Sequence, residues 1–524
     1  MKQLFLLIFI VIIFTACLST KQYNSKIRAK HAPEELKRDL DIIKNSLEEA
    51  HPGVYWYISK PNLDIKFDSV KNLLTDSLST IEFYRMIAPV VAAVKCGHTR
   101  LVYPGIKLSN SQKDSIKNEG KAPLSQLYYF VDNDRIYVPF VNDRDLIKPI
   151  KGAEILAIDN VPSAEIIKQT KRLFSSDGYN QTFYNKVLDQ SFAAYYYLKY
   201  TRKDSSLLTL KKADSTYNYY IKTIKPQKLK GKPKILSAEE NKKDKEQKKL
   251  ANKIKNRNRY KGIDSEGKSI LNISYDSIVN NTAIIKVKSF SFDHSNFHRF
   301  FRESFKEIKE KHIQNVILDL RDNGGGNLMS CDLLFRYLYN QPHQYTGRAY
   351  IKNLNFENSK YLDDPLFYKV LGKVFYPSFW LATQILTRKD SVGKYTYILT
   401  GRSIKPKKYV YNKNLTVLIN GYSFSATSLL SANLQQLNRG TFIGEETGGG
   451  YNKCTAGSIP FLVLPETKLK LRLPLKVIQT VKKRPLEGRG VFPEYPIEEN
   501  FIDVLNKRDR YLEKARELIK VNSR

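Results

Sequence analysis

The sequence predicts an α/β fold for the C-terminal half of the chain, built around a largely parallel sheet. Between residues 281 and 445, apolar strand-like runs alternate with amphipathic helix-like runs. Strands that alternate with helices are typical of parallel sheets with helical crossovers. Two of the strand-like runs end in unusual corners, one with three consecutive glycines and one crowded with hydroxyl side chains.

The first residues resemble an export signal. Met1-Lys2 is positively charged, residues 4–14 are apolar, and the small residues that follow end at Cys17. The apolar run is too short for a comfortable membrane span and fits a secretory signal. A cysteine directly after the small residues resembles a bacterial lipobox, which predicts that residues 1–16 are removed and Cys17 is lipidated. The alternative is an ordinary signal peptide with an incidental cysteine.

Two regions precede the α/β half. Residues 30–105 show helical periodicity and end in the polar loop "CGHT", which enters a strand. Residues 120–225 are dominated by short strands. Within them, a strand at Glu154–Ile158, a turn at Asp159-Asn160 and a helix capped by Ser163 resemble the core of a PDZ domain. PDZ domains bind peptide ends by strand addition.

Residues 226–268 form a basic linker or insertion. The whole chain of 524 residues has a formal net charge of +35, and residues 228–261 contain 14 Lys/Arg against 4 Asp/Glu. Few apolar residues and no aromatic-glycine RNA motif are present, so we interpret the segment as solvated and partly helical or disordered. Attraction to lipid headgroups is the second interpretation. We expect no nucleic-acid partner.

The α/β half is predicted over residues 270–500, with a C-terminal helix over 501–524. Strands are predicted at "NTAIIKVKSF", "QNVILDL", "NLTVLING" and "RGTFIGEE", with helices between them. The aromatic-rich stretch 363–386 fits a lid, a substrate-facing surface or core, and core is preferred.

The cysteines give no support for a metal or a disulfide framework. Three remain after Cys17, an odd number for an exported chain, and their spacing matches no zinc pattern. We therefore predict no cofactor and no metal.

The two corners carry the chemistry. Glycines in "VILDLRDNGGGN" let several backbone N–H groups converge on one point, which suits an oxyanion or a phosphate. A phosphate loop would carry a lysine and Ser/Thr after the glycines, whereas Asn327-Leu328 follow here. In "NGYSFSATSLLSANLQQ", Ser425 lies where a strand turns into a helix. It fits an exposed nucleophile or a helix cap.

Together, "AAVKCGHTRL", "VILDLRDNGGG" and "VLINGYSFSATSLLSANLQQLNRGTFIGEETGGG" resemble, in order and spacing, the S41 serine peptidases. These are the tail-specific or C-terminal processing proteases, related to the tricorn core and the chlamydial protease-like activity factor. The resemblance covers most of residues 98–494. It implies a crotonase-like α/β peptidase core with a helical N-terminal region and a PDZ-like domain. It also implies Ser425 as nucleophile, with oxyanion donors from Ala426, Gly324 and Gly325.

The chain departs from the tail-specific branch in the residue that would act as general base. That branch has a lysine where this chain has Gly450, and Lys453 is three residues away. The tricorn and chlamydial branch uses a histidine and a glutamate instead, which implies His98 as general base and Glu487 as the residue that orients it. Neutral imidazole accepts a serine proton near pH 7, and a carboxylate fixes its tautomer.

The N-terminal signal with Cys17 predicts a lipid-anchored protein of the cell envelope that faces the periplasm or the cell surface, and the family resemblance implies a serine endopeptidase. It would cleave polypeptides through an acyl-enzyme on Ser425. One alternative is a catalytically silent peptide-binding or scaffold protein on the same fold, suggested by the missing lysine. Another is a hydrophobic-ligand carrier, against which the intact serine and glycine corners argue.

Overall fold

The structure is a computed structural model. It describes residues 20–109, 112, 120–141, 143–224, 249, 258–264, 267–291, 295–353, 356–363, 387–389, 395–397 and 401–522. The predicted signal with Cys17, nearly all of the basic segment and nearly all of the aromatic stretch lie outside the described residues. Within the described part, no helix is both long and apolar enough to cross a membrane.

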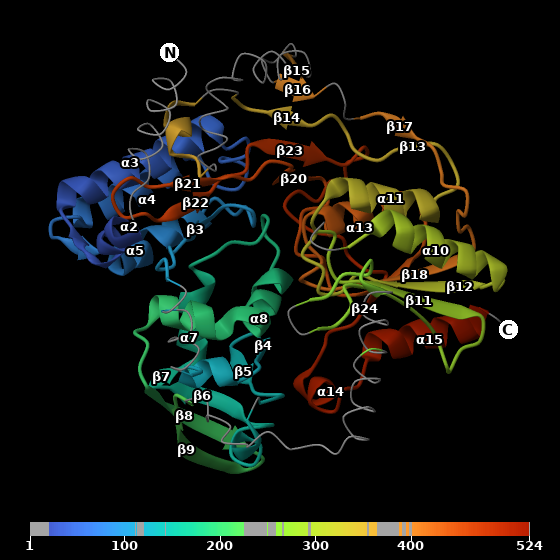
Figure 1. Ribbon diagram of the computed structural model, residues 1–524, viewed down its shortest axis with the longest axis horizontal. Helices are drawn as coiled ribbons and strands as arrows, with labels where there is room; N and C mark the ends of the chain where they lie inside the picture. The colour runs from blue at the N-terminus through green and yellow to red at the C-terminus, as the bar shows by residue number, and fades with distance from the viewer. Residues whose placement is uncertain are drawn as a thin grey trace.

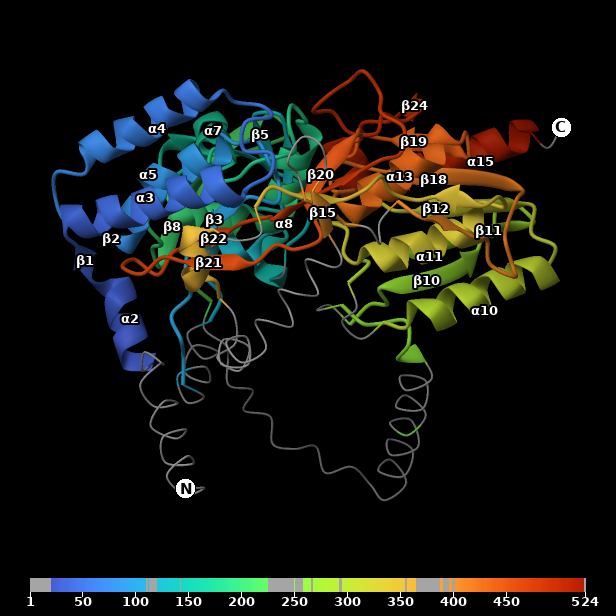
Figure 2. The same cartoon turned by 90° about the horizontal axis from the view of Figure 1, so that it is seen from above.

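The N-terminal region is helical, as predicted. Its helices are α2 (Thr20–Arg28), α3 (Pro33–Ala50), α4 (Lys60–Leu73) and α5 (Thr80–Ala92). Its strands are β1 (Lys30–His31), β2 (Leu78–Ser79) and β3 (Arg100–Val102). A hairpin from much later in the chain, β21 (Phe461–Val463) and β22 (Lys470–Arg472), pairs with β3 in one sheet. Leucines of this hairpin complete the hydrophobic core of the region, which ties it to the C-terminal half (Figure 2).

The β-rich region has a five-stranded path with the order β4-β5-β6-β8-β9, and β7 pairs with β6. Its strands are β4 (Phe130–Asp132), β5 (Arg135–Tyr137), β6 (Glu154–Ile158), β7 (Val161–Pro162), β8 (Ser205–Lys212) and β9 (Ser215–Lys222). Its helical segments are η1 (Pro123–Gln126), η2 (Arg144–Leu146), α7 (Ser163–Lys171) and α8 (Thr182–Lys199).

Two details of this region differ from the sequence prediction. The N-cap of α7 is Pro162, and the Ser163 hydroxyl instead donates to the carbonyl of Ile155. The long helix α8 was not expected. Its tyrosines and phenylalanines favour strands by propensity, whereas packing against the β-rich core holds them in a helix.

The peptidase-like half contains a six-stranded sheet with the order β10-β11-β12-β18-β19-β24. All neighbours are parallel except the edge strand β10. The strands are β10 (Leu271–Tyr275), β11 (Thr282–Val287), β12 (Asn315–Asp319), β18 (Asn414–Ile419), β19 (Thr441–Gly444) and β24 (Tyr495–Pro496). The predicted strands at 281–290, 314–320, 414–421 and 439–446 are thus present.

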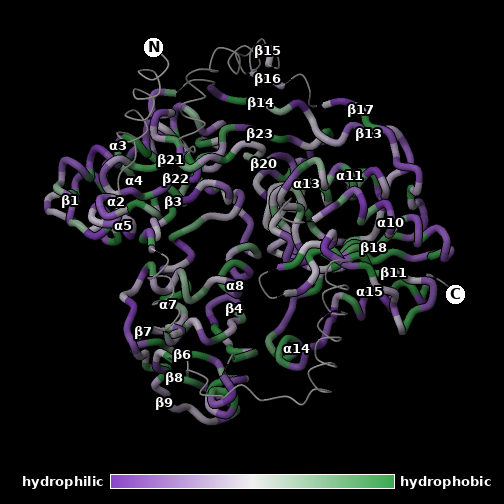
Figure 3. Tube along the Cα trace, in the orientation of Figure 1, coloured by the Kyte–Doolittle hydropathy of each residue, from purple (hydrophilic) through white to green (hydrophobic). Residues whose placement is uncertain are grey.

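Helices cover both faces of this sheet (Figure 1). On one face lie α10 (Phe297–Glu310), α11 (Leu328–Leu338) and α13 (Ala426–Gln436), and on the other lies α15 (Arg510–Asn522). Alternate residues of the central strands, such as Val417 and Leu418, enter two separate cores. Burial on both faces explains the continuous apolar runs of these strands, which Figure 3 colours mainly as hydrophobic.

Smaller elements complete the fold. A second sheet contains β15 (Thr387–Lys389), β16 (Tyr395–Tyr397), β14 (Tyr350–Ile351), β23 (Lys476–Gln479) and β20 (Lys453–Ala456). Strand β13 (His343–Gln344) pairs with β17 (Ser403–Ile404), and η3 (Glu357–Tyr361) precedes the aromatic stretch. The expected single C-terminal helix is divided into α14 (Phe501–Leu505) and α15, with Lys507 at φ +57° between them.

Candidate active site

Ser425 occupies a strained corner between β18 and α13. Its backbone has φ 57° and ψ −123°, a region that side chains other than glycine rarely adopt. Although Ser425 is the N-cap of α13, its hydroxyl makes no capping hydrogen bond. The strained turn therefore presents the Ser425 Oγ atom without using it structurally, which is the arrangement of a nucleophile elbow.

The neighbouring hydroxyls have structural partners. Ser423 Oγ donates to the carbonyl of Leu320 at 2.9 Å and accepts from the N–H of Asn420 at 3.1 Å. Ser428 Oγ donates to the carbonyl of Ser423 at 2.8 Å. The Thr427 hydroxyl is buried and has no partner among the described residues. The hydroxyls of Ser423 and Ser428 therefore satisfy nearby backbone groups, whereas that of Thr427 does not.

The glycine corner packs directly on Ser425. A Cβ atom on Gly325, whose φ is +95°, would lie 2.8 Å from the Ser425 Cβ and 3.0 Å from the Ala426 nitrogen. The Gly325 N–H donates to the Asn323 side chain at 2.9 Å and is therefore already engaged. The N–H groups of Gly324 and Ala426 have no acceptor among the described residues. Those two are the donors that remain available to an oxyanion.

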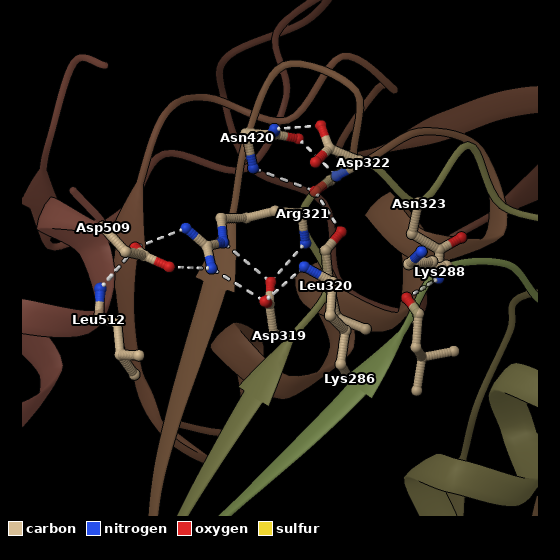
Figure 4. A network of polar contacts seen from close by, with 12 residues as sticks. Lys286, Lys288, Asp319, Leu320, Arg321, Asp322, Asn323, Asn420, Asp509 and Leu512 are labelled. Carbon is tan, nitrogen blue, oxygen red and sulfur yellow. Dashed lines mark hydrogen bonds and ion pairs between the residues drawn. The ribbon is translucent and has the colours of Figure 1, made fainter. Parts of the chain in front are cut away.

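Polar contacts join the glycine corner, which follows β12, to the serine corner, which follows β18 (Figure 4). The side chain of Asn420 accepts from the N–H of Asp322 at 3.0 Å and donates to its carboxylate at 2.9 Å. The Arg321 guanidinium forms ion pairs with two carboxylates, that of Asp319 at 2.9 Å and that of Asp509 at 2.8 Å between nitrogen and oxygen. Burial would raise the pKa of Asp319, but Arg321 and Lys286 outweigh it and lower that pKa to about 2. The end of β12 is therefore fixed to both the serine corner and the start of α15.

His98 reaches the serine from the N-terminal region. Its Nε2 atom lies 2.9 Å from the Ser425 Oγ atom. The ring is 3% exposed and lies against the ring of Phe424, with the centroids 4.8 Å apart. Burial, followed by the charges of Arg472 and Arg100, lowers the pKa of His98 to about 3. The imidazole is therefore neutral near pH 7, as a proton acceptor must be.

A buried carboxylate that the sequence analysis did not single out lies beside His98. Asp177 accepts from the N–H of Gly97 at 2.8 Å and of Gly450 at 3.2 Å. A carboxylate oxygen of Asp177, a ring nitrogen of His98 and the sulfur of Cys96 all lie within 4.8 Å of one another. Burial raises the pKa of Asp177 to about 6. The Nδ1 atom of His98 is buried and has no partner among the described residues.

The Cys96–His98–Asp177 cluster has the ligand types of a metal site. The Cys96 sulfur, however, lies 2.8 Å from the Thr455 hydroxyl, and the Asp177 carboxylate accepts two backbone N–H groups. His98 Nε2 contacts Ser425, whereas His98 Nδ1 has no partner among the described residues. We therefore describe the cluster as part of the polar surroundings of His98.

Glu487 and Lys453 lie together and apart from this network. The Lys453 ammonium is 3.2 Å from the Glu487 carboxylate and 4.4 Å from the centre of the Trp56 ring. Asn452 donates to the other Glu487 oxygen at 3.3 Å. The Glu487 side chain is 49% exposed, and no hydrogen bond or ion pair joins it to His98. The structure thus brings Ser425, His98, Gly324, Gly325 and Ala426 together but not Glu487, and Cys17 lies outside the described residues.

No local signal distinguishes Asp177 in the sequence. It stands in "SSDGYN", where Asp-Gly is an ordinary turn dipeptide. Only the packing of this turn against the loops of Gly97 and Gly450, far away in the sequence, gives Asp177 its place beside the histidine.

Comparisons with known proteins identify a family domain and a shared fold. Residues 281–497 match the model of peptidase family S41. The chain is similar to the solved structures of a CPAF mutant (TM-score 0.61) and of mature CPAF complexed with lactacystin (TM-score 0.59), each at 14% identity. The alignments cover 93% of this chain and 97% and 98% of those chains, and at this identity they concern the fold alone. No curated protein sequence matches the chain. The predicted fold class is confirmed. Residues 281–497 form a peptidase family S41 domain, and this domain supports the predicted class of serine-type peptidase.

Proposed function

We propose that the protein hydrolyses peptide bonds in polypeptides through an acyl-enzyme on Ser425, with His98 as general base. The observation that carries the proposal is the 2.9 Å contact between the His98 Nε2 atom and the Oγ atom of a serine held in a strained corner. Nucleophile and base at hydrogen-bond distance are the central requirement of acyl transfer by serine.

The geometry supports the following sequence of steps. The Ser425 Oγ atom attacks the carbonyl carbon of the scissile bond while its proton moves to His98 Nε2. The negative charge that develops on the carbonyl oxygen is stabilised by the N–H groups of Ala426 and Gly324. His98 then donates its proton to the leaving amine. A water molecule, deprotonated by His98, finally hydrolyses the acyl-enzyme.

We further propose that Asp177 orients His98 in place of Glu487. The imidazole becomes a cation in the transition state, and a buried carboxylate beside it stabilises that charge. Asp177 is buried within the His98 cluster, whereas Glu487 is half-exposed and paired with Lys453. An orienting role for Glu487, as the family resemblance implies, would need its carboxylate to leave Lys453 and move to His98.

Covalent labelling with a fluorophosphonate probe tests the nucleophile. The wild type should be labelled and should cleave casein. Ser425→Ala should abolish both while the circular dichroism spectrum is unchanged. Ser431→Ala is the matched control, because the Ser431 hydroxyl also lies on α13 but donates to the carbonyl of Thr427. Equal labelling of wild type and Ser425→Ala would refute the assignment.

A further inference from the structure

Two arginines face each other across neighbouring strands beside the catalytic pair. Arg100 of β3 and Arg472 of β22 are directly opposite Cα partners in an antiparallel pair. Like charges at such positions repel each other and destabilise the sheet. Neither guanidinium forms an ion pair with any residue in the part of the chain that the structure describes. Arg100 contacts the Tyr195 hydroxyl, which is not an anion.

Burial makes the charge of Arg472 more costly, whereas Arg100 is exposed. Arg472 is half-buried, and burial, followed by the charge of Arg100, lowers the pKa of its guanidinium. The neighbouring cation of β22 is different, because Lys470 lies 2.6 Å from the carboxylate of Asp363. Among the described residues, Lys470 of this strand thus has a carboxylate partner, whereas Arg472 has none.

Arg100 begins β3 two residues after His98, and the pairing of β3 with β22 places Arg472 opposite Arg100, so both arginines adjoin the loop that carries His98. Both lower the pKa of His98, and both lower the pKa of Tyr422, although burial raises the latter overall. The ring of Tyr422 lies 3.1 Å from where a Cβ atom on Gly324 would be. The positive charge therefore reaches both His98 and the side of the site that carries the oxyanion loop.

We propose that Arg100 and Arg472 form a subsite that binds a carboxylate of the polypeptide substrate next to the scissile bond. A partly desolvated guanidinium forms its strongest contact with a carboxylate, bidentately. In a peptidase the polypeptide supplies that group, as its C-terminus or as an Asp or Glu side chain. This inference rests on the proposed function, since it places the subsite beside Ser425.

The subsite has a consequence for catalysis. A bound carboxylate offsets the two positive charges that now act on His98, and it thereby makes the imidazole a stronger base. Substrates with the carboxylate should therefore gain in kcat as well as in KM, which simple attraction to a basic protein would not produce.

Four matched peptides test the subsite. They share one cleavable sequence and carry either Glu or Gln near the scissile bond, with either a free C-terminal carboxylate or a carboxamide. Wild type should prefer at least one carboxylate form by about tenfold or more in kcat/KM. Arg472→Gln and Arg100→Gln should reduce that ratio to near one, whereas the control Lys470→Gln should keep it. Loss of preference on amidation identifies the C-terminus, and loss on Glu-to-Gln exchange identifies a side chain.

A binding measurement separates the subsite from the chemistry. Calorimetry on Ser425→Ala should show tighter binding of the carboxylate peptide than of its neutral analogue. Ser425→Ala combined with Arg472→Gln should show equal binding of the two. Equal binding to Ser425→Ala alone would overturn the subsite whatever the activity. Absence of probe labelling in wild type would instead overturn the proposed nucleophile and leave the binding result valid.

Discussion

At the scale of single residues, burial decides which group near Ser425 titrates in the working pH range. The pKa of His98 is lowered to about 3 and that of the nearby His51 also to about 3, in both cases mainly by burial. Burial raises the pKa of the Cys96 thiol to about 11. Asp177, with its pKa raised to about 6, is then the group of this cluster that changes charge between pH 5 and 8.

We therefore expect kcat/KM to rise with pH through about 6 as Asp177 loses its proton. Below that pH the carboxyl is neutral and does not stabilise the imidazolium of the transition state. Asp177→Asn should lower kcat on the order of 10²- to 10⁴-fold and remove the rise, because His98 is already neutral. Glu487→Gln should keep the rise. A pH profile unchanged by Asp177→Asn would exclude Asp177 as the positioning residue.

The identity of the base gives a second prediction at this scale. His98→Ala should lose on the order of a thousandfold or more in rate, because Ser425 then has no proton acceptor. Lys453→Ala should retain nearly full rate, since its ammonium contacts Glu487 and the Trp56 ring instead of Ser425. Steady-state cleavage of one peptide by both variants decides the matter. The opposite ranking would assign the base to Lys453.

The family resemblance named some of these residues and not others. It implied Ser425 and His98, and the structure brings their side chains within 2.9 Å of each other. Asp177 stands in an ordinary turn, and only contacts with Gly97 and Gly450, distant in the sequence, distinguish it. The glycine loop was predicted as a set of donors, but the Asn323 side chain that engages the Gly325 N–H could not be anticipated.

At the scale of elements, the site depends on two strand ends that meet. Asn323 accepts from the Gly325 N–H through its side chain and from the Phe424 N–H through its carbonyl, at 2.9 and 3.0 Å. The hydroxyl of Ser423, in the other corner, donates to the carbonyl of Leu320. The two corners thus act as one rigid unit, and a change in one displaces the other.

Gly325→Ala should therefore impair catalysis more than folding. The new Cβ would lie 2.8 Å from both the Phe424 carbonyl oxygen and the Ser425 Cβ, at a φ of +95°. We expect a loss of about 1–3 kcal/mol in the free energy of unfolding and at least a hundredfold loss in kcat. Gly105→Ala is the matched control, since nothing lies within 4 Å of its added Cβ. Denaturant unfolding and steady-state kinetics measure both effects. Wild-type kcat in Gly325→Ala would contradict this account of the corner.

Strands were predictable from the sequence where both of their faces are buried. The central strands β12 and β18 are buried on both faces, so their apolar runs were clear. Helix α8 was missed because its aromatic residues favour strands when considered alone. The pairing of β3 with β22 was missed because it joins residues about 370 positions apart through three residues each, too short a pattern to recognise.

At the scale of the whole molecule, the residues of the proposed active site come from distant parts of the chain. The S41 match at residues 281–497 contains Ser425 but neither His98 nor Asp177. The hairpin β21–β22 bridges this separation, because it leaves the peptidase half and packs into the core of the N-terminal region. The same hairpin carries Arg472. The N-terminal region therefore contributes His98 to the proposed active site and is more than an appendage to the S41 domain.

The N-terminal region would also link the enzyme to the membrane. Helix α2 begins at Thr20, three residues after Cys17. A fully extended chain of that length spans only about 10 Å, so a lipid on Cys17 would hold the described body close to the bilayer. Basic side chains of α2, including Lys26 and Arg28 in its last turn, would then lie near anionic headgroups and add to the attachment.

We therefore expect the mature protein to begin with a diacylglyceryl-modified Cys17 and to sediment with membranes. Mass spectrometry of the N-terminal peptide should find this mass, and Cys17→Ala should release the protein or leave it unprocessed. Cys96→Ala is a control that removes a cysteine without touching the signal, and it should remain in the membrane fraction. Ser425→Ala should also remain there, because anchoring does not depend on catalysis. An unmodified N-terminus at another residue would refute the anchor. A hydrolase released in this way would still cleave soluble peptides, since the active site is formed entirely by residues that follow the anchor.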